Sequence, residues 1–507
     1  MLKRVTLLVL LLLFVAGLVK GSVIIWAPGN GTITYPNPIA GVGADGKNGF
    51  VIVVPFNMTS TGKPVVPGAW VVYLKSNGSV NWVEAVKGDF LHSPRILYAT
   101  ANGSTLLIGR DWNGNHTDLW VVELSENGTL VWSKDYLLNV SPGWIPFVDD
   151  AVQTGDRILI TTHVEYDING IDVSKPLVLA LDRRSGEVLW ARDYWIVHGP
   201  RELYSVGAGE LAKGYYLILH DSGKRYYYAR LGSNGEVISV KEFKTNLRGF
   251  FVKSTASTGE AIYFLGGSSN GTVLGEIENN AVLWSKLYRL IPIKECTETG
   301  QNISLRSVST SSTEPTRSLI LSNGNLFFQP AIIEAFRLDC VGIDTTYEVV
   351  KTDTHGNVKS SFVLVGNGTG MESEAFVAPS GMAVMGNSFI SVWRLVALNG
   401  SIGTFRDLAI VSSFGDVING KAFKVYPFKV TVEPAHIHLA PMVIVKSSKV
   451  AVKTFKGRVG VKATKGDIPI VIKPLKSLKE KPEGSICGPA VVIPIAFLPL
   501  LLRWRNG

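Results

Sequence analysis

Hydrophobic and polar residues alternate along this chain in short runs that are typical of β-strands. Buried-strand runs of four to six apolar or β-branched residues recur between turn residues, for example at 50–54, 157–162, 215–219, 261–265 and 382–385. Such runs predict strands inside a sheet. Residues 25–412 show no long helical periodicity. The pattern therefore predicts an all-β protein.

A short sequence motif, which we call the phrase, accompanies these runs. Its clearest copy, LDRRSGEVLW at 181–190, places Trp190 four residues after Gly186. Two-residue hairpin turns favour Asn-Gly because both central residues need positive φ, so each copy predicts a hairpin of two outer strands. The seven turns are Asn77-Gly78, Asn127-Gly128, Ser185-Gly186, Asn234-Gly235, Asn279-Asn280, His355-Gly356 and Asn399-Gly400.

The phrase recurs roughly every 45–60 residues. This spacing is typical of a β-propeller, in which four-stranded blades surround a central channel. Seven copies predict a seven-bladed propeller over residues 25–412. The gap between the Asn280 and Gly356 copies is wider than the others. We interpret it as one blade with a long loop insertion, and an eighth blade is the alternative. A sandwich array or several small β-domains would also produce such strands.

The copy at 181–190, with Asp182 and Gly186, resembles the repeat of pyrroloquinoline-quinone-type propellers. The resemblance covers a few residues per blade. It implies blade construction rather than cofactor use, because propellers of that family also serve as binding scaffolds without a quinone. We therefore assign no cofactor, since neither quinone nor calcium has specific support, and no metal-ligating set is predicted.

The first residues read as an export signal. Lys3 and Arg4 precede an apolar run from Val5 to Val19, and we expect residues 1–21 to be a signal peptide that is removed. An uncleaved anchor is the alternative. Export permits disulfides.

The last residues form a second apolar segment. Cys487-Gly488-Pro489, the apolar run to Leu502 and the terminal arginines resemble the CGP-CTERM sorting tail of secreted Thermococcales proteins. The resemblance implies an archaeal cell surface, with Cys487 as the processing or lipid-attachment residue. We therefore expect 486–507 to be a sorting and anchor tail that holds the protein on the extracellular face of the cell membrane. A short membrane helix is the alternative.

Positive charge is concentrated ahead of this tail. Residues 421–485 carry 14 Lys and Arg against 4 Asp and Glu, whereas the whole chain has a net charge of +9. The propeller itself is therefore close to neutral, which disfavours a nucleic-acid partner. We expect residues 413–472 to form a small basic β stalk and residues 473–485 to form a linker. The lysines would be solvated or would face anionic headgroups.

Cysteines and sequons fit an exported protein. Cys296 and Cys340 both fall in the wide gap, in two loops that the blade arrangement places on one face, and we predict a disulfide between them. Two separate thiols are the alternative. Among many Asn-x-Ser/Thr sites, the glycosylation candidates are Asn57, Asn102, Asn115, Asn139 and Asn302.

Function is expected in the loops that line the mouth of the propeller. Aromatic faces beside charged groups suit sugars and peptides. The ligand-binding candidates are Arg110, Trp112, Trp144, Trp195, His198 and Arg201. No phosphate-binding loop or zinc spacing is found, and no catalytic residue is assigned. The sequence thus predicts a surface-tethered binding propeller for a glycan or peptide. A surface-anchored quinoprotein or hydrolase is the alternative.

Overall fold

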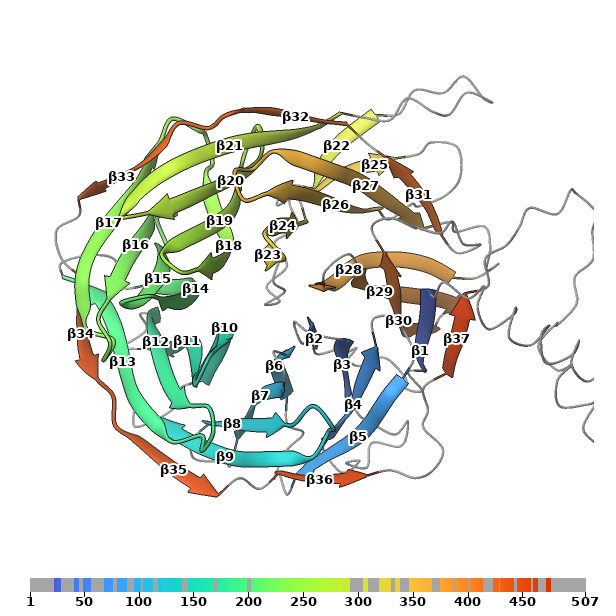
Figure 1. Ribbon diagram of the computed structural model, residues 1–507, viewed down its shortest axis with the longest axis horizontal. Helices are drawn as coiled ribbons and strands as arrows, with labels where there is room; N and C mark the ends of the chain where they lie inside the picture. The colour runs from blue at the N-terminus through green and yellow to red at the C-terminus, as the bar shows by residue number, and fades with distance from the viewer. Residues whose placement is uncertain are drawn as a thin grey trace, which may run out of the picture.

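The computed structural model shows a ring of β-sheets around a central channel (Figure 1). It describes residues 22–28, 41–44, 49–55, 68–75, 80–88, 95–101, 104–112, 117–138, 145–167, 172–197, 202–291, 304–308, 319–329, 333–337, 346–366, 374–385, 388–399, 402–413, 423–427, 429–441, 445–456, 459–463 and 471–475. No helix within these ranges has the length and apolar character needed to cross a membrane. The predicted all-β propeller is confirmed.

Six blades have the predicted construction, with four consecutive antiparallel strands ordered from the channel outward. In blades two to six the phrase forms the turn between the third and fourth strands. Blade one contains β2 (Gly41–Ala44), β3 (Gly49–Pro55), β4 (Gly68–Lys75) and β5 (Val80–Gly88). Blade two contains β6 (Arg95–Ala101), β7 (Thr105–Trp112), β8 (Thr117–Leu124) and β9 (Leu130–Leu138). Blade three contains β10 (Ile145–Thr154), β11 (Arg157–Asp167), β12 (Asp172–Asp182) and β13 (Val188–Ile196).

The next three blades continue the same order around the ring. Blade four contains β14 (Leu203–Leu211), β15 (Gly214–Asp221), β16 (Tyr226–Leu231) and β17 (Val237–Thr245). Blade five contains β18 (Phe251–Thr258), β19 (Ala261–Ser268), β20 (Gly271–Glu278) and β21 (Ala281–Ile291). Blade six contains β23 (Leu319–Ser322), β24 (Asn325–Phe328), β26 (Thr346–Asp353) and β27 (Val358–Gly366). The wide gap adds a separate ribbon, β22 (Ser304–Val308) with β25 (Ile333–Arg337), so it holds one blade with an insertion.

The prediction of a seven-bladed propeller is wrong, because the structure has six blades of this construction. The seventh copy of the phrase lies between β29 (Ser388–Asn399) and β30 (Ile402–Ser413), which are the second and third strands of a composite sheet. The first strand is β28 (Glu374–Met385), and the fourth is β1 (Ser22–Pro28) from the other end of the chain. This composite sheet closes the ring because β1 pairs with the free edge of β30.

The expected stalk is a belt around the ring. After the composite sheet, seven short strands each pair antiparallel with the fourth strand of one sheet. They are β31 (Phe423–Pro427), β32 (Lys429–Pro434), β33 (Ile437–Pro441), β34 (Val445–Lys449), β35 (Val452–Lys456), β36 (Val459–Ala463) and β37 (Val471–Leu475). They follow blades six, five, four, three, two and one in that order and end on β1. Figure 1 shows the belt in orange and red around the outside.

The belt has a physical reason. The outer strand of a blade presents unpaired N–H and C=O groups, and an exposed edge of that kind needs a partner or a cover. Each belt strand supplies that partner for five or six residues. The stalk prediction failed because segments as short as VKSSK and VKTFK carry little strand signal without the edge that receives them.

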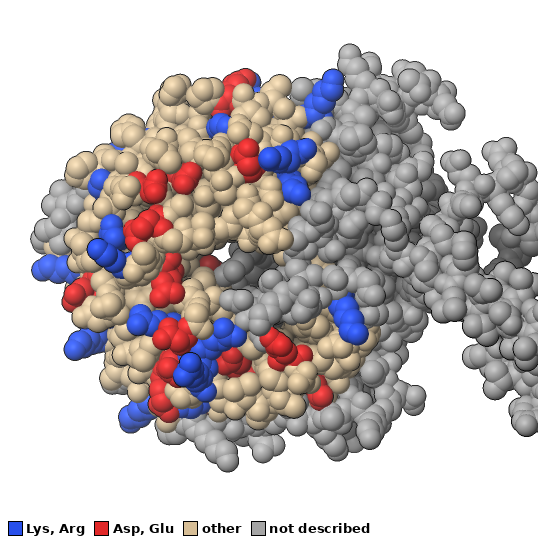
Figure 2. Space-filling view, viewed as in Figure 1, with Lys and Arg blue, Asp and Glu red and all other residues tan. Residues whose placement is uncertain are grey.

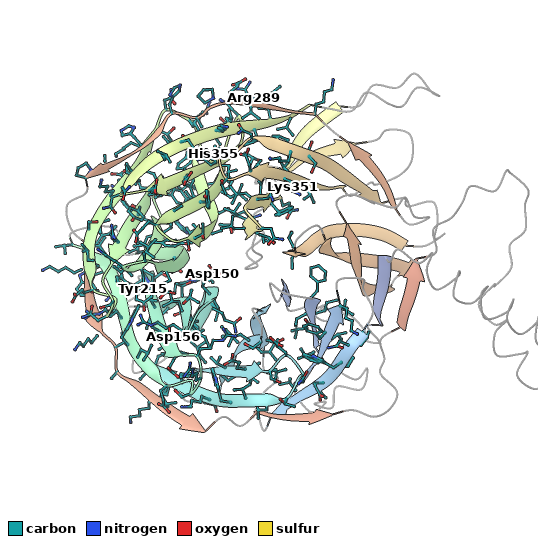
Figure 3. The ribbon with its side chains drawn as sticks, viewed as in Figure 1. Asp150, Asp156, Tyr215, Arg289, Lys351 and His355 are labelled. Atoms are coloured by element: carbon teal, nitrogen blue, oxygen red, sulfur yellow. The ribbon has the colours of Figure 1, made fainter. Side chains whose placement is uncertain are left out.

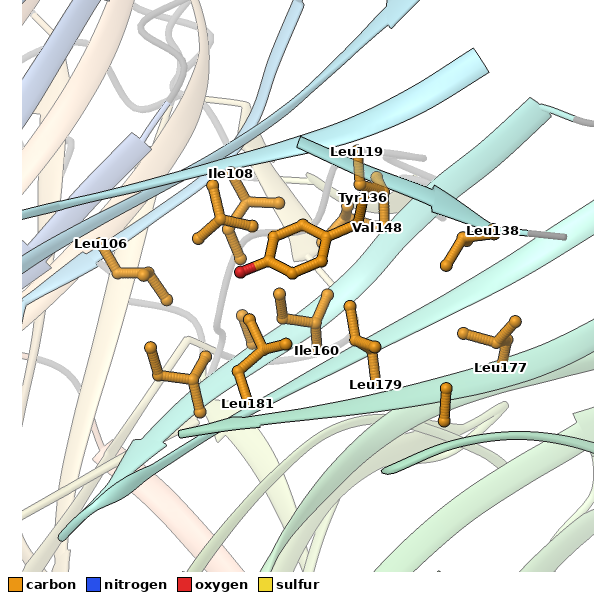
Figure 4. Packing of buried hydrophobic residues seen from close by; sticks show 14 of the residues in the cluster. Leu106, Ile108, Leu119, Tyr136, Leu138, Val148, Ile160, Leu177, Leu179 and Leu181 are labelled. Carbon is orange, nitrogen blue, oxygen red and sulfur yellow. The ribbon is translucent and has the colours of Figure 1, made fainter. Parts of the chain in front are cut away.

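Apolar residues pack between neighbouring blades. The cluster between blades two and three contains Leu106, Tyr136, Ile160 and Leu179, all fully buried (Figure 4). Burying a side chain of this size stabilises by roughly 1.5–3 kcal/mol. Equivalent clusters lie between the other described pairs of blades, so the ring is a series of interblade cores.

The repeated phrase connects one blade to the next. Gly186 of blade three has φ of +67°, and a Cβ added there would lie 2.7 Å from a ring atom of Trp132 in blade two. The Trp132 indole N–H donates to the carbonyl of Arg183 at 2.7 Å, and the Tyr136 hydroxyl donates to that of Gly186 at 2.6 Å. We call this contact of Trp and Tyr with the following turn the turn latch.

The turn latch recurs around the ring. The Tyr194 hydroxyl donates to the carbonyl of Gly235 at 2.7 Å, and the Tyr288 hydroxyl donates to that of Gly356 at 2.6 Å. At the interface between blades five and six, Trp284 also contacts the turn, since a Cβ on Gly356 would lie 2.7 Å from its ring. The Trp and Tyr that lie four and eight residues after the turn of one blade therefore contact the turn of the next blade.

Candidate functional site: the mouth of blades three to five

One face of the ring is built by the loops that join second to third strands and by those that join successive blades. His163 lies near the end of β11, Tyr204 near the start of β14, and His220 one residue before the end of β15. Tyr226 begins β16, and Phe250 immediately precedes β18. Because these strand ends share one face, their side chains gather at the mouth of blades three to five.

The five rings form a continuous row, which we call the mouth row. Tyr204 stacks on His220 with centroids 5.0 Å apart and planes inclined by 20°, and it meets His163 edge-on at 5.2 Å. His220 contacts Tyr226 at 5.5 Å, and Tyr226 meets Phe250 edge-on at 5.9 Å. The row therefore crosses from blade three to blade five without a break.

Asp149 orients one end of the mouth row. It occupies a β-bulge in β10, between Val148 and Asp150, and bulges re-aim side chains. Its carboxylate lies 2.5 Å from Nδ1 of His163 and accepts a hydrogen bond of 2.5 Å from the Ser205 hydroxyl. The side chains of His163 and Asp149 are 16% and 12% exposed, so the pair is recessed but reaches solvent.

The arrangement differs from a nucleophilic triad. In a triad the hydroxyl contacts the imidazole, and the carboxylate contacts the other ring nitrogen. Here Ser205 donates to Asp149, and both the hydroxyl and the imidazole converge on one carboxylate. The geometry fixes the histidine in place and suits recognition of a ligand.

A buried carboxylate holds the loop beneath His220. Burial raises the pKa of Asp221, but hydrogen bonds from the Tyr227 hydroxyl at 2.6 Å and from the backbone and side chain of Arg225 at 2.9 and 2.7 Å outweigh it, so this pKa is below its ordinary value. Desolvation lowers the pKa of His220 itself, which keeps its ring neutral at pH 7. The stacked part of the mouth row is therefore uncharged.

The innermost strand of blade five, β18, carries a positively charged side chain, that of Lys253. Lys253 is the bulged residue of β18, as Asp149 is of β10, because the register shifts between Val252 and Ser254. Lys253 is half-buried, and desolvation lowers its pKa. Asp150, the neighbour of Asp149, lies toward the channel, whereas Asp156 and Tyr215 lie farther out (Figure 3). Bulges thus place opposite charges on two channel-lining strands.

The structure separates the residues predicted to bind a ligand. Arg110 and Trp112 end β7 on the same face as the mouth row, in blade two. Trp195 lies on β13, the fourth strand of blade three, at the outer rim, where Lys175 lies 5.6 Å from its ring. Trp144, His198 and Arg201 lie outside the described residues.

Other predicted sites also lie outside the described residues. They are Cys296, Cys340 and Cys487, with Asn57, Asn102, Asn115, Asn139 and Asn302. The ribbon within the wide gap pairs Ser304 with Arg337, which lie eight residues after Cys296 and three before Cys340 in the sequence. Within the described ranges, no group of three or more His, Cys, Asp and Glu residues is arranged to hold a metal ion.

Sequence reasoning missed the mouth row because its members lie inside strand patterns and look like core residues. His163 and His220 each follow a run of apolar and β-branched residues. A histidine near the end of such a strand was the available signal, but the stacking partners come from other strands and cannot be paired from sequence.

Comparisons with known proteins identify no family. Neither protein-family models nor curated proteins match the sequence. Solved structures with similar architecture include the WD40 β-propeller domain of Doa1, with 9% identity, a TM-score of 0.37, and coverage of 76% of this chain and 96% of that one. A neuraminidase-like protein of subtype N11 from A/flat-faced bat/Peru/033/2010 (H18N11) has 10% identity and a TM-score of 0.33, with 77% and 96% coverage. The WD40 domain of SCAP from fission yeast has 11% identity and a TM-score of 0.27, with 82% and 94% coverage.

The sheet order, rather than these distant similarities, defines the class: the chain is a β-propeller protein with a closing composite sheet and an outer belt. The comparisons leave the resemblance to pyrroloquinoline-quinone-type propellers and to the sorting tail untested, and both stay predictions. Propellers serve many functions, so function has to be argued from the mouth.

Proposed function

We propose that the protein is a cell-surface binding propeller that is anchored through its C-terminal tail and recognises an extracellular glycan or peptide at the mouth of blades three to five. The mouth row carries this proposal. Partly exposed rings such as Tyr204, His220 and Phe250 can cover apolar faces of a ligand, while a carboxylate-oriented imidazole supplies directional hydrogen bonds. Anchoring and location rest on the two apolar terminal segments of the sequence.

The experiment measures binding of the purified protein to glycan and peptide arrays, followed by titration of the best ligand. We expect Tyr204→Ala to weaken binding at least tenfold without a comparable loss of thermal stability. Trp195→Ala removes an aromatic side chain at the outer rim and serves as the matched control. Loss of binding in the Trp195 variant alone would place the ligand site elsewhere.

The Asp149–His163 pair supports a second candidate, a surface-anchored hydrolase, because a carboxylate-oriented imidazole also suits a general base. Turnover of a bound ligand distinguishes the two. If product forms and His163→Gln abolishes its formation while the ligand is retained, the protein is an enzyme and the binding-module proposal is wrong.

A further inference from the structure

The innermost strands of blades three, four and five each contain a β-bulge at the same distance from the end of the strand. The bulged residues are Asp149 in β10, Val206 in β14 and Lys253 in β18. These strands border the channel, which Figure 1 shows at the centre of the ring and Figure 2 shows as a hollow in its surface. One position on the channel wall therefore carries a carboxylate, an aliphatic group and an ammonium group in successive blades.

The second strand of the blade supplies a partner to the bulged residue in blade three and none in blade five. In blade three, the residue two positions before the bulge is paired with His163, whose imidazole contacts Asp149. In blade five, the residue two positions before the bulge is paired with Gly267. Since glycine has no side chain, β19 offers Lys253 no partner at the place where β11 offers an imidazole.

The ammonium group of Lys253 is partly removed from water and lacks a counter-charge. Lys253 is half-buried, and no ion pair or hydrogen bond to its ammonium is found among the described residues. Desolvation lowers its pKa, and no described carboxylate opposes this effect. The carboxylate of Asp149 already serves His163 and Ser205. Holding a positive charge in such a place costs free energy, which a carboxylate of the ligand would offset.

Lys253 lies just beyond the blade-five end of the mouth row. Phe250, the last ring of the row, precedes Lys253 by three residues, which span at most about 11 Å of chain. The exposed large hydrophobic side chains of the described residues all lie elsewhere, on outer strands and on the belt. The mouth therefore offers aromatic rather than aliphatic surface beside its cation, which suits the flat faces of sugar rings better than the aliphatic side chains of a peptide.

We infer that the ligand of the mouth is an acidic glycan, whose sugar rings lie on the mouth row while a uronate carboxylate binds the ammonium group of Lys253. The inference names the ligand class for the proposed function and rests on it. A hydrogen bond between an ammonium and a carboxylate is about twice as strong as one between neutral groups. Loss of one such bond weakens binding by roughly tenfold or more.

The test compares oligomers of glucuronic acid and of galacturonic acid with their methyl esters, which keep the sugar rings but lose the negative charge. The wild-type protein should bind an acid roughly tenfold more tightly than its ester. Lys253→Gln should bind the two forms equally and keep the affinity for the ester, whereas Lys253→Arg keeps the positive charge and should retain most of the preference. The matched control is Lys213→Gln, because Lys213 is exposed in the turn between β14 and β15, on the face opposite the mouth.

Amine labelling with mass spectrometry reports on Lys253 without any substitution. A bound uronate should slow the labelling of Lys253 several-fold more than its ester does, while Lys213 reacts at one rate throughout. Equal affinity of the wild-type protein for acid and ester, or unchanged labelling of Lys253 with the acid bound, would overturn the inference and leave the proposed function intact. Acidic peptides that bind through Lys253 in place of uronates would overturn the assignment to a glycan. If neither acid nor ester binds and the arrays also show no ligand, the proposed function fails together with the inference.

Discussion

A single methyl group at Gly186 should test the turn latch. Gly186 has φ of +67°, and a Cβ there would approach ring carbons of Trp132 at 2.7–2.9 Å. Alanine in the left-handed region costs roughly 1–2 kcal/mol. Overpacking a well-packed contact adds typically 1–3 kcal/mol, because Trp132 is held by its own hydrogen bonds. We expect Gly186→Ala to lower the free energy of unfolding by about 2–5 kcal/mol.

The chain contains a matched control with the same backbone angle. Gly324 also has φ of +67°, but no atom lies within 4 Å of an added Cβ. Gly324→Ala should therefore cost only the backbone part, about 1–2 kcal/mol. Denaturant unfolding of the two variants, followed by tryptophan fluorescence, measures the difference. Equal losses in the two variants would refute a tight latch.

A second change separates steric overlap from general damage. Trp132→Leu alone should destabilise the protein, because it removes ring contacts and the hydrogen bond to the Arg183 carbonyl. Added to Gly186→Ala, it should cost less than the sum of the two single changes, since the smaller side chain leaves room for the methyl group. Additive costs would contradict direct contact between the two residues.

Three further predictions follow from the fold. Asp221→Asn should lower the free energy of unfolding at pH 7 by about 2 kcal/mol. Because the pKa of Asp221 is lowered in the folded protein, its contribution to stability is present above the ordinary aspartate pKa and is lost as pH falls through the folded value. Urea unfolding should therefore show the difference in stability between wild type and variant closing below about pH 4. Peptide mapping without reductant should find Cys296 joined to Cys340, and separate free thiols would contradict the pairing. A chain stopped after Ser413 lacks the belt and should aggregate at concentrations where the full chain does not, as light scattering would show, because the outer edges lose their partners.

The sequence predicts the parts of this fold that are local. The strands that flank the first six copies of the phrase pair as hairpins where they were expected, because hairpin formation depends on adjacent residues. Among the described turns, positive φ at both central residues occurs only at Asn279-Asn280, and in the others only the glycine has it. The strands on either side of the seventh copy, β29 and β30, also pair, but they are the second and third strands of their sheet, since the other neighbour of β30 is a strand from the other end of the chain. The pairing of β1 with β30 joins residues about 380 positions apart, and no pattern in either strand's own sequence indicates it.

The same reasoning explains the site. The mouth row lies beside the two loop types that were expected to line the mouth, but it depends on stacking between strands of three blades. His163 finds Asp149 only because a bulge turns that carboxylate. Bulges and ring stacking are products of packing, and a single strand pattern does not contain them.

The belt determines the order in which the sheets of this protein can be completed during folding. The chain travels around the ring once to lay down the blades and then returns in the opposite sense to cover them, so β36 reaches β5 across more than 370 residues. Contacts of such separation form slowly. During synthesis, the outer edge of each blade stays open until its own belt strand leaves the ribosome, first β31 on blade six and later β36 on blade one. We expect native packing of the ring to be completed after translation, in a single late event that starts at β31 on blade six and finishes at β1.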